Sequence, residues 1–190
     1  MAGLRRGLLP GASRLPGGAR LQGRLPGAVV LGGILLVLSC AAPQGLEAQD
    51  PTGDEAAVLE VIQELFDAMA ARDPEAAEAV LLPEGYFISH REENGERVLS
   101  TVSHQEFLAS MAEWEEEPLE RIWDPLVMVH GGVAVAWTPY DFWWGGEFSH
   151  CGVNVFSLTD TPEGWQIASI VYTVERTGCE PSPLGPPDGG

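Results

Sequence analysis

Four strand-like runs joined by short turns fill residues 119–175 and constrain the fold more than any other feature of the chain. The runs cover residues 119–129, 133–144, 147–159 and 165–175. They are rich in β-branched and aromatic residues, which is typical of strands. The turns between them contain Gly131-Gly132, Gly145-Gly146 and residues 160–164. Consecutive hairpins of this kind predict an antiparallel meander.

Helices are predicted ahead of the meander. Apolar residues recur along residues 58–69 with the spacing of one helix face. Asp73 followed by Pro74 predicts the start of a second, short helix. Ser103 with Glu106 three residues later forms a capping box, which predicts the start of a third helix.

A further hairpin is predicted between the second and third helices. Asn94-Gly95 is a strong signal for a tight turn, and it lies between the strand-like segments 86–90 and 97–101. We therefore expect a single α+β domain over residues 54–179, with three helices and an antiparallel sheet.

The Gly145-Gly146 turn also predicts a register. If it is a two-residue hairpin loop, counting outward gives the opposing pairs Trp144 with Glu147, Trp143 with Phe148, Asp141 with His150, Trp137 with Asn154, and Val135 with Phe156. From Trp143 with Phe148 outward, the paired residues are an even number of positions apart along each strand, so their side chains point to one face of the sheet.

That face would be an apolar surface with a few converging polar groups, the usual composition of a small-ligand site. The ligand-binding residues expected there are Trp137, Trp143, Phe148, Asn154 and Phe156. Asp141 and His150 are the candidate catalytic residues, as an acid/base pair; the alternative is a structural pair that satisfies its own hydrogen bonds. The opposite face would carry Tyr140, Phe142, Cys151, Val153 and Val155, which favours packing against a neighbour or a second subunit in a homodimer.

The N-terminus reads as an export signal over residues 1–40. An arginine-bearing stretch precedes eleven apolar residues, 28–38, too few to span a bilayer as a helix. Residues 37–40 resemble a lipobox, which predicts lipidation of Cys40; the alternative is cleavage after Ala48. The protein would be periplasmic or membrane-anchored by this lipid alone, or otherwise secreted. Residues 41–53 would form a flexible tether and residues 180–190 a disordered tail.

Charge and cysteine content restrict the partners further. From Asp50 onward, 27 acidic residues face five arginines, a formal charge of −22, which argues against nucleic-acid binding. If Cys40 is lipidated, Cys151 and Cys179 remain as a possible disulfide in an oxidising compartment, or as two thiols. The histidines and cysteines show no metal-site spacing, and no cofactor motif is present, so we expect neither a metal nor a cofactor.

The chain resembles the nuclear transport factor 2 superfamily, which includes SnoaL-like and ketosteroid isomerase-like proteins. The segments that carry the resemblance are 65–73, 120–125, 139–142, 148–153, 164–167 and Gly178-Cys179. The match is to a subgroup of exported bacterial proteins of unassigned function. The resemblance implies a cone of curved sheet wrapped around helices, with a cavity on the concave face.

Three functions remain open at this stage, because the same cone serves enzymes and binding proteins. The first is binding of a small apolar or amphipathic ligand in the cavity. The second is an isomerase- or cyclase-type enzyme that uses Asp141 and His150, with Tyr86 or Tyr140 as a hydrogen-bond donor. The third is a protein-interaction domain whose cavity is filled by its own side chains.

Overall fold

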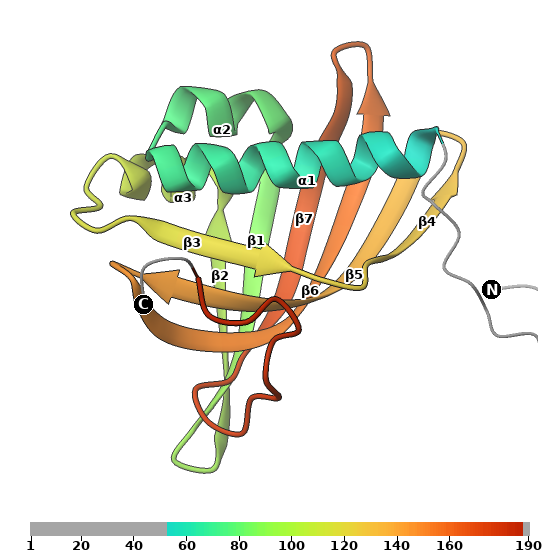
Figure 1. Cartoon of the computed structure of the whole chain (residues 1–190). Helices are drawn as coiled ribbons and strands as arrows, with labels where there is room; N and C mark the ends of the chain where they lie inside the picture. Colours follow the sequence, from blue (N-terminus) through green and yellow to red (C-terminus); the bar gives the residue numbers. More distant parts are fainter. Residues whose placement is uncertain (1–52, 188–190) are drawn as a thin grey trace, which may run out of the picture. The chain divides into compact units, whose positions relative to one another are not determined.

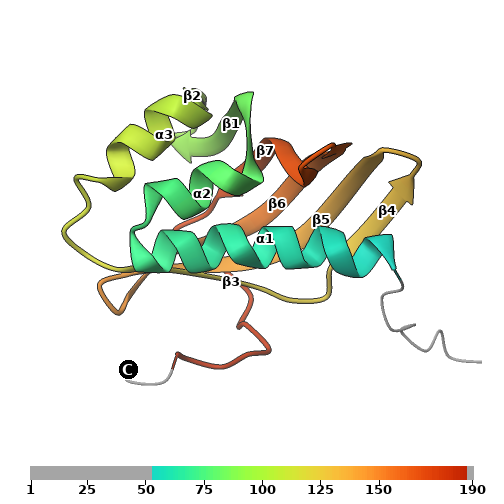
Figure 2. The same cartoon turned by 90° about the horizontal axis from the view of Figure 1, so that it is seen from above.

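The computed structural model describes residues 53–187. Three helices, α1 (Asp54–Ala71), α2 (Pro74–Val80) and α3 (His104–Met111), pack on a curved sheet, with α1 running across its strands (Figures 1 and 2). The predicted signal over residues 1–40, the lipidated Cys40 and most of the predicted tether lie outside the described residues. No helix within the described part is long and apolar enough to cross a membrane.

The sheet has seven strands. These are β1 (Leu81–Glu93), β2 (Glu96–Ser103), β3 (Pro118–Ile122), β4 (Leu126–His130), β5 (Val133–Trp144), β6 (Glu147–Thr161) and β7 (Gly164–Val174). Their order is β2-β1-β7-β6-β5-β3, with β4 also paired to β5. The predicted α+β cone is therefore confirmed, with one difference: β1 joins β7 in parallel, so the sheet is mixed rather than wholly antiparallel.

Local sequence signals explain the element boundaries. The Asp73 carboxylate accepts hydrogen bonds from the first turn of α2, and Ser103 and Glu106 form the predicted capping box of α3. Asn94 and Gly95 both have positive φ and join β1 to β2 in the predicted tight turn.

The predicted strand over residues 119–129 is wrong as a single element. It divides into β3 and β4, and both pair with β5. Between them Asp124 has a positive φ, and Pro125 has no backbone N–H to donate to a ladder. The break turns β3 into a short edge strand of its own.

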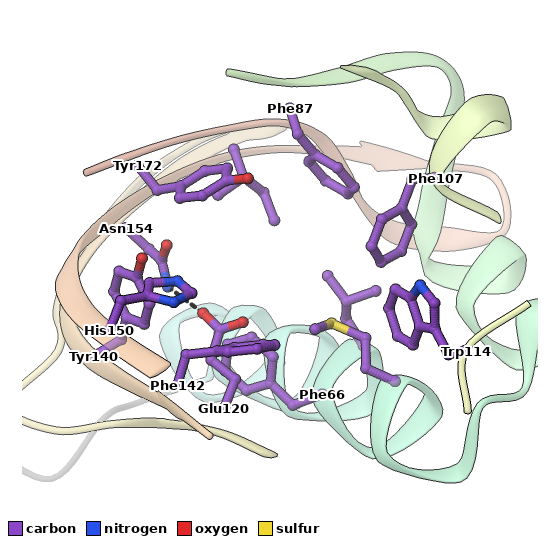
Figure 3. Close-up of a pocket in the computed structure, with 13 residues that line it drawn as sticks. Phe66, Phe87, Phe107, Trp114, Glu120, Tyr140, Phe142, His150, Asn154 and Tyr172 are labelled. Atoms are coloured by element: carbon purple, nitrogen blue, oxygen red, sulfur yellow. Dashed lines mark hydrogen bonds between the residues drawn. The ribbon is translucent and has the colours of Figure 1, made fainter. Parts of the chain in front are cut away.

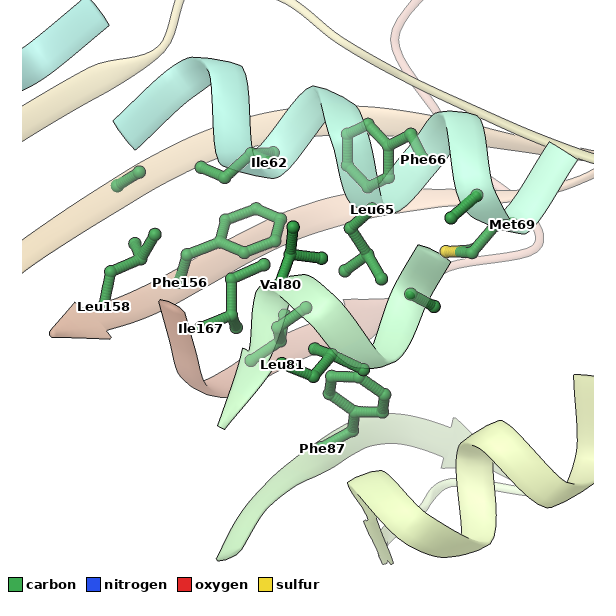
Figure 4. Close-up of a cluster of buried hydrophobic side chains, with 14 of the residues drawn as sticks. Ile62, Leu65, Phe66, Met69, Val80, Leu81, Phe87, Phe156, Leu158 and Ile167 are labelled. Atoms are coloured by element: carbon green, nitrogen blue, oxygen red, sulfur yellow. The ribbon is translucent and has the colours of Figure 1, made fainter. Parts of the chain in front are cut away.

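The hydrophobic core lies between α1, α2 and the concave face of the sheet (Figure 4). Val58, Ile62 and Leu65 are fully buried on the predicted face of α1. They pack over Phe156 and Ile167 from the central strands. This core fixes which face of the sheet is internal.

The predicted register of the β5–β6 hairpin is wrong beyond its first two pairs. Trp144 lies opposite Glu147 and Trp143 opposite Phe148, as expected, but Phe142 lies opposite His150. Ser149 is therefore an extra residue in β6, a β-bulge that shifts the remaining pairs by one. A one-residue shift moves a strand's side chains to the other face of the sheet.

A disulfide closes the C-terminal end of the domain. Cys151 and Cys179 are bonded, with their Cα atoms 6.1 Å apart. The chain after β7 turns back through an isolated bridge between Cys151 and Glu175, which brings Cys179 within reach. In the predicted tail, the described residues to 187 form a loop whose Gly185 carbonyl accepts a hydrogen bond from Arg121 at 2.8 Å.

Candidate functional site

A cavity of about 180 Å³ lies on the concave face of the sheet, beneath the helices (Figure 3). Its lining consists of Leu65, Phe66, Met69, Phe87, Phe107, Trp114, Glu120, Tyr140, Phe142, His150, Asn154, Ile170 and Tyr172. The side chains of the domain neither fill nor seal this space. The cavity is therefore lined mainly by aromatic and aliphatic groups, with a few polar groups among them.

The structure divides the predicted site residues between the two faces. His150 and Asn154 line the cavity, and Phe156 is fully buried in the core behind it. On the opposite, convex face, Trp137 is 50% exposed and Phe148 is 44% exposed. The residues expected to form one cluster are therefore separated by the thickness of the sheet, because of the bulge at Ser149.

Asp141 belongs to the convex face and is not paired with His150. Its carboxylate accepts a hydrogen bond of 2.9 Å from Nε of Arg121, and a second from the same guanidinium. The Arg121 guanidinium lies 5.7 Å from the centre of the Trp143 ring. Asp141, Arg121 and Trp143 thus form a structural group that attaches the edge strand β3 to β5.

Glu120 is the acidic residue of the cavity, and the sequence reasoning did not select it. It lies on β3 opposite Phe142 and points into the open centre (Figure 3). Its Oε1 accepts a hydrogen bond of 2.6 Å from the Asn154 side-chain amide. Burial raises the pKa of Glu120 to about 7, although the Asn154 hydrogen bond acts in the opposite direction.

A sequence signal for Glu120 exists, although it is weak. Pro118, Glu120 and Ile122 occupy alternate positions of one strand, so a charged residue falls between two apolar ones on the same face. An acid at such a position is a candidate for a buried functional group.

His150 packs among the aromatic residues of the cavity. Its ring stacks on Phe142 with centroids 4.9 Å apart and meets Tyr140 edge to face at 5.7 Å. Its Nδ1 lies 2.9 Å from the Ser149 hydroxyl. Burial, followed by the charge of Arg176, lowers the pKa of His150 to about 4, so the ring is neutral at physiological pH.

The two tyrosines considered as donors have different positions. Tyr140 lies in the cavity wall, and its hydroxyl donates to the Thr173 carbonyl at 2.7 Å, so that donor is already used. Burial raises the pKa of Tyr140. Tyr86 is 44% exposed and does not line the cavity.

The other histidines and the acids give no further site. His104 is 1% exposed, and its Nδ1 lies 2.7 Å from the Leu82 carbonyl. Within residues 53–187, no three His, Cys, Asp or Glu side chains come together in a way that could hold a metal ion.

Comparison with known proteins supports the fold. Residues 53–173 match the protein family described as "Putative lumazine-binding". No curated protein matches the chain.

Solved structures with the same fold have low sequence identity to the chain. One is a nuclear transport factor 2-like protein from Cytophaga hutchinsonii, with 15% identity, a TM-score of 0.54, and coverage of 65% of this chain and 99% of the other. Another is a nuclear transport factor 2-like superfamily protein from Salmonella enterica serovar Typhimurium, with 17% identity, a TM-score of 0.51, and coverage of 68% and 99%. These similarities establish the fold alone.

Proposed function

The chain belongs to the family described as putative lumazine-binding, and on this premise we propose that it binds a small, partly aromatic or amphipathic ligand in its concave cavity. The observation that carries the proposal is an unfilled, aromatic-lined space with one carboxyl group in its lining. In another protein, an apolar cavity of about 150 Å³ accommodates a benzene-sized molecule. The volume here, about 180 Å³, therefore suits a ligand with a compact ring system.

Three polar groups would orient the ligand. Asn154 donates a side-chain N–H to Glu120 Oε1, and both residues line the cavity, so the Asn154 carbonyl oxygen and Glu120 Oε2 would be the groups that bind a ligand. The Nε2 atom of His150 is a third candidate, since Nδ1 is engaged by Ser149. Few polar groups in an apolar wall favour one orientation of a bound molecule.

Native mass spectrometry of the protein, purified from the periplasm of an expression host, tests this function. We expect a small organic molecule that is carried through purification and lost after organic extraction. Glu120→Gln and Phe142→Ala should reduce its occupancy. The matched controls are Glu147→Gln, an exposed strand acid, and Phe148→Ala, an exposed aromatic on the convex face. Equal loss from cavity variants and controls would argue against the cavity as the site.

A second candidate function is acid/base catalysis, with Glu120 as the acid/base group in place of Asp141. The observation that favours it is the pKa of about 7 at Glu120, which is suited to proton transfer near neutral pH. His150, neutral beside it, would orient the substrate. Turnover that is abolished by Glu120→Gln, with ligand occupancy retained, would distinguish catalysis from binding.

The proposed location is outside the cytoplasm, with the chain anchored through a lipid on Cys40 or secreted after cleavage near Ala48. The Cys151–Cys179 disulfide supports an oxidising compartment. The mass of the mature N-terminus, compared between the native chain and Cys40→Ser, tests the anchor. A lipid-sized mass on both variants, or on neither, would contradict lipidation at Cys40.

We also propose that the chain forms a homodimer through its convex face. Exposed apolar residues gather there on neighbouring strands, including Met128, Val133, Trp137 and Val171. Because the chain is strongly acidic, an anionic membrane surface would repel it. The exposed apolar area therefore suits contact with a second copy of the chain better than contact with such a membrane. Sedimentation analysis should show a dimer that Trp137→Glu converts to a monomer; a monomer before mutation would contradict it.

A further inference from the structure

Within residues 53–187, Glu120 is the only acid that lines the cavity, and no arginine or lysine lines it. Its hydrogen bond from Asn154 comes from a neutral amide. The neighbouring Arg121 points to the other face, where it is bound to Asp141. In the described part of the chain, no cationic side chain in the lining therefore neutralises the Glu120 carboxylate.

The other arginines near this end of the sheet do not supply that charge. Arg91 forms an ion pair with Glu93, with 2.6 Å between its Nε and the carboxylate. Arg176 is exposed after the end of β7, and neither arginine lines the cavity. A carboxylate held in an apolar site without a cationic partner is costly, and a bound cation would remove that cost.

The walls of the cavity add a second attraction for cations. Phe87, Phe107 and Trp114 form consecutive edge-to-face contacts, at 4.7 and 5.7 Å between ring centres. Figure 3 shows these rings on one side of the open centre and Glu120, with Phe142 and His150, on the other. Aromatic faces attract organic cations through the ring quadrupole, and aromatic cages are a common means of recognising ammonium groups.

We propose that the cavity binds an organic monocation, a quaternary or protonated amine whose charge lies between Glu120 and the aromatic rings and whose apolar part occupies the rest of the cavity. This assignment rests on the proposed ligand-binding function and names the ligand class. The formal charge of −22 from Asp50 onward attracts such ligands and repels anions. A bare metal ion fits poorly, because the cavity offers one carboxylate and hard cations need several oxygen ligands.

Binding of a cation must favour the ionised form of Glu120. The titratable groups around it are Tyr140, Tyr172 and His150, which are neutral near pH 7, and Asp141, which acts through the sheet. Because burial raises the pKa of Glu120 to about 7, affinity for a permanent cation should fall about tenfold for each pH unit below that value. Affinity for an uncharged ligand of the same shape should stay nearly constant.

Phenyltrimethylammonium and tert-butylbenzene make a matched pair of probes, since they share a shape and differ in charge. NMR titration of the purified protein at pH 8 should show the cation bound at least tenfold more tightly than its neutral analogue. In Glu120→Gln this preference should be lost, with the neutral probe bound as well as before or better. Glu147→Gln is the control for the charge change, and it should keep the preference.

The pH series on the unmutated protein provides an independent test if Glu120→Gln does not fold. Equal affinity for the two probes at pH 8, or a cation affinity that does not change between pH 5 and 8, would overturn the assignment while leaving cavity binding intact. Failure of both probes to bind would count against the proposed function itself.

Discussion

Phe142 lies opposite His150 across the β5–β6 hairpin, and Asp141 lies opposite Cys151. This pairing puts His150 on the concave face and Asp141 on the convex face. One inserted residue, Ser149, thus decides which acid can share a cavity with the histidine, and that acid is Glu120.

The Glu120 and His150 side chains should affect stability in opposite directions as pH changes. Burial raises the pKa of Glu120 to about 7. The contribution of this carboxyl to the free energy of unfolding is therefore present at low pH and is lost as pH rises from about 4.5 to 7. Burial lowers the pKa of His150 to about 4, so its contribution is present above about pH 6.5 and is lost as pH falls. The two effects oppose each other between pH 4.5 and 6.5.

Glu120→Gln should remove the pH dependence of stability that comes from Glu120 and leave that of His150. The free energy of unfolding of this variant, minus that of the unmutated protein, should rise by on the order of 2 kcal/mol as pH increases from 4.5 to 7. This figure allows for solvent in the cavity. Urea unfolding at a series of pH values measures this difference. A difference that does not vary with pH would mean that the carboxyl is fully solvated.

Asp141→Asn should destabilise the domain by about 3 kcal/mol, because it leaves the Arg121 guanidinium without its buried partner. The double variant Arg121→Met/Asp141→Leu should recover most of that loss, since apolar replacements need no partner. Urea unfolding of both variants provides the comparison. A single variant as stable as the unmutated protein would show that the ion pair contributes little.

Cys179→Ser should lower the free energy of unfolding by about 3 kcal/mol, as expected for opening a loop of 28 residues. Dithiothreitol should reduce the stability of the unmutated protein by a similar amount and leave Cys179→Ser unchanged. Thermal unfolding with and without the reductant measures both effects. A reductant effect of equal size in the variant would show that the loss does not come from the disulfide.

Gly152→Ala should cost about 2 kcal/mol, because a Cβ at this position would collide with the backbone carbonyl of Thr173 on the adjacent strand. Gly132→Ala is the matched control: its Cβ would meet only Asp160, at an ordinary 3.8 Å, so its stability should change little. Equal effects in the two variants would contradict a specific close approach at Gly152.

Much of the fold could be predicted from the sequence because its signals are local. The Asn94-Gly95 turn, the Asp73 and Ser103 caps and the Gly145-Gly146 loop each depend on a few adjacent residues, and each is confirmed. The parallel pairing of β1 with β7 could not be predicted in this way, because it joins segments about 80 residues apart and no local signal specifies it.

The candidate site was harder to predict because the face to which a strand residue points is counted from the turn, and one inserted residue changes the count for every later position. The bulge at Ser149 puts His150 and the alternate residues after it on the face opposite to Phe148, and serine at that position gives no sequence signal for an insertion. Glu120 was missed for a related reason: its strand was expected to run on to residue 129, and the break at Asp124 separates the short segment that faces the cavity.

Carbon-13 NMR titration of the Glu120 side-chain carboxyl is the most direct test of the central claim, that this group is the desolvated acid in the lining of an apolar ligand cavity. We predict a midpoint near 7 in the free protein and a lower midpoint when phenyltrimethylammonium is bound. A midpoint near 4.5 that the probe does not change would contradict the account, because it would show a solvated carboxyl outside any binding site.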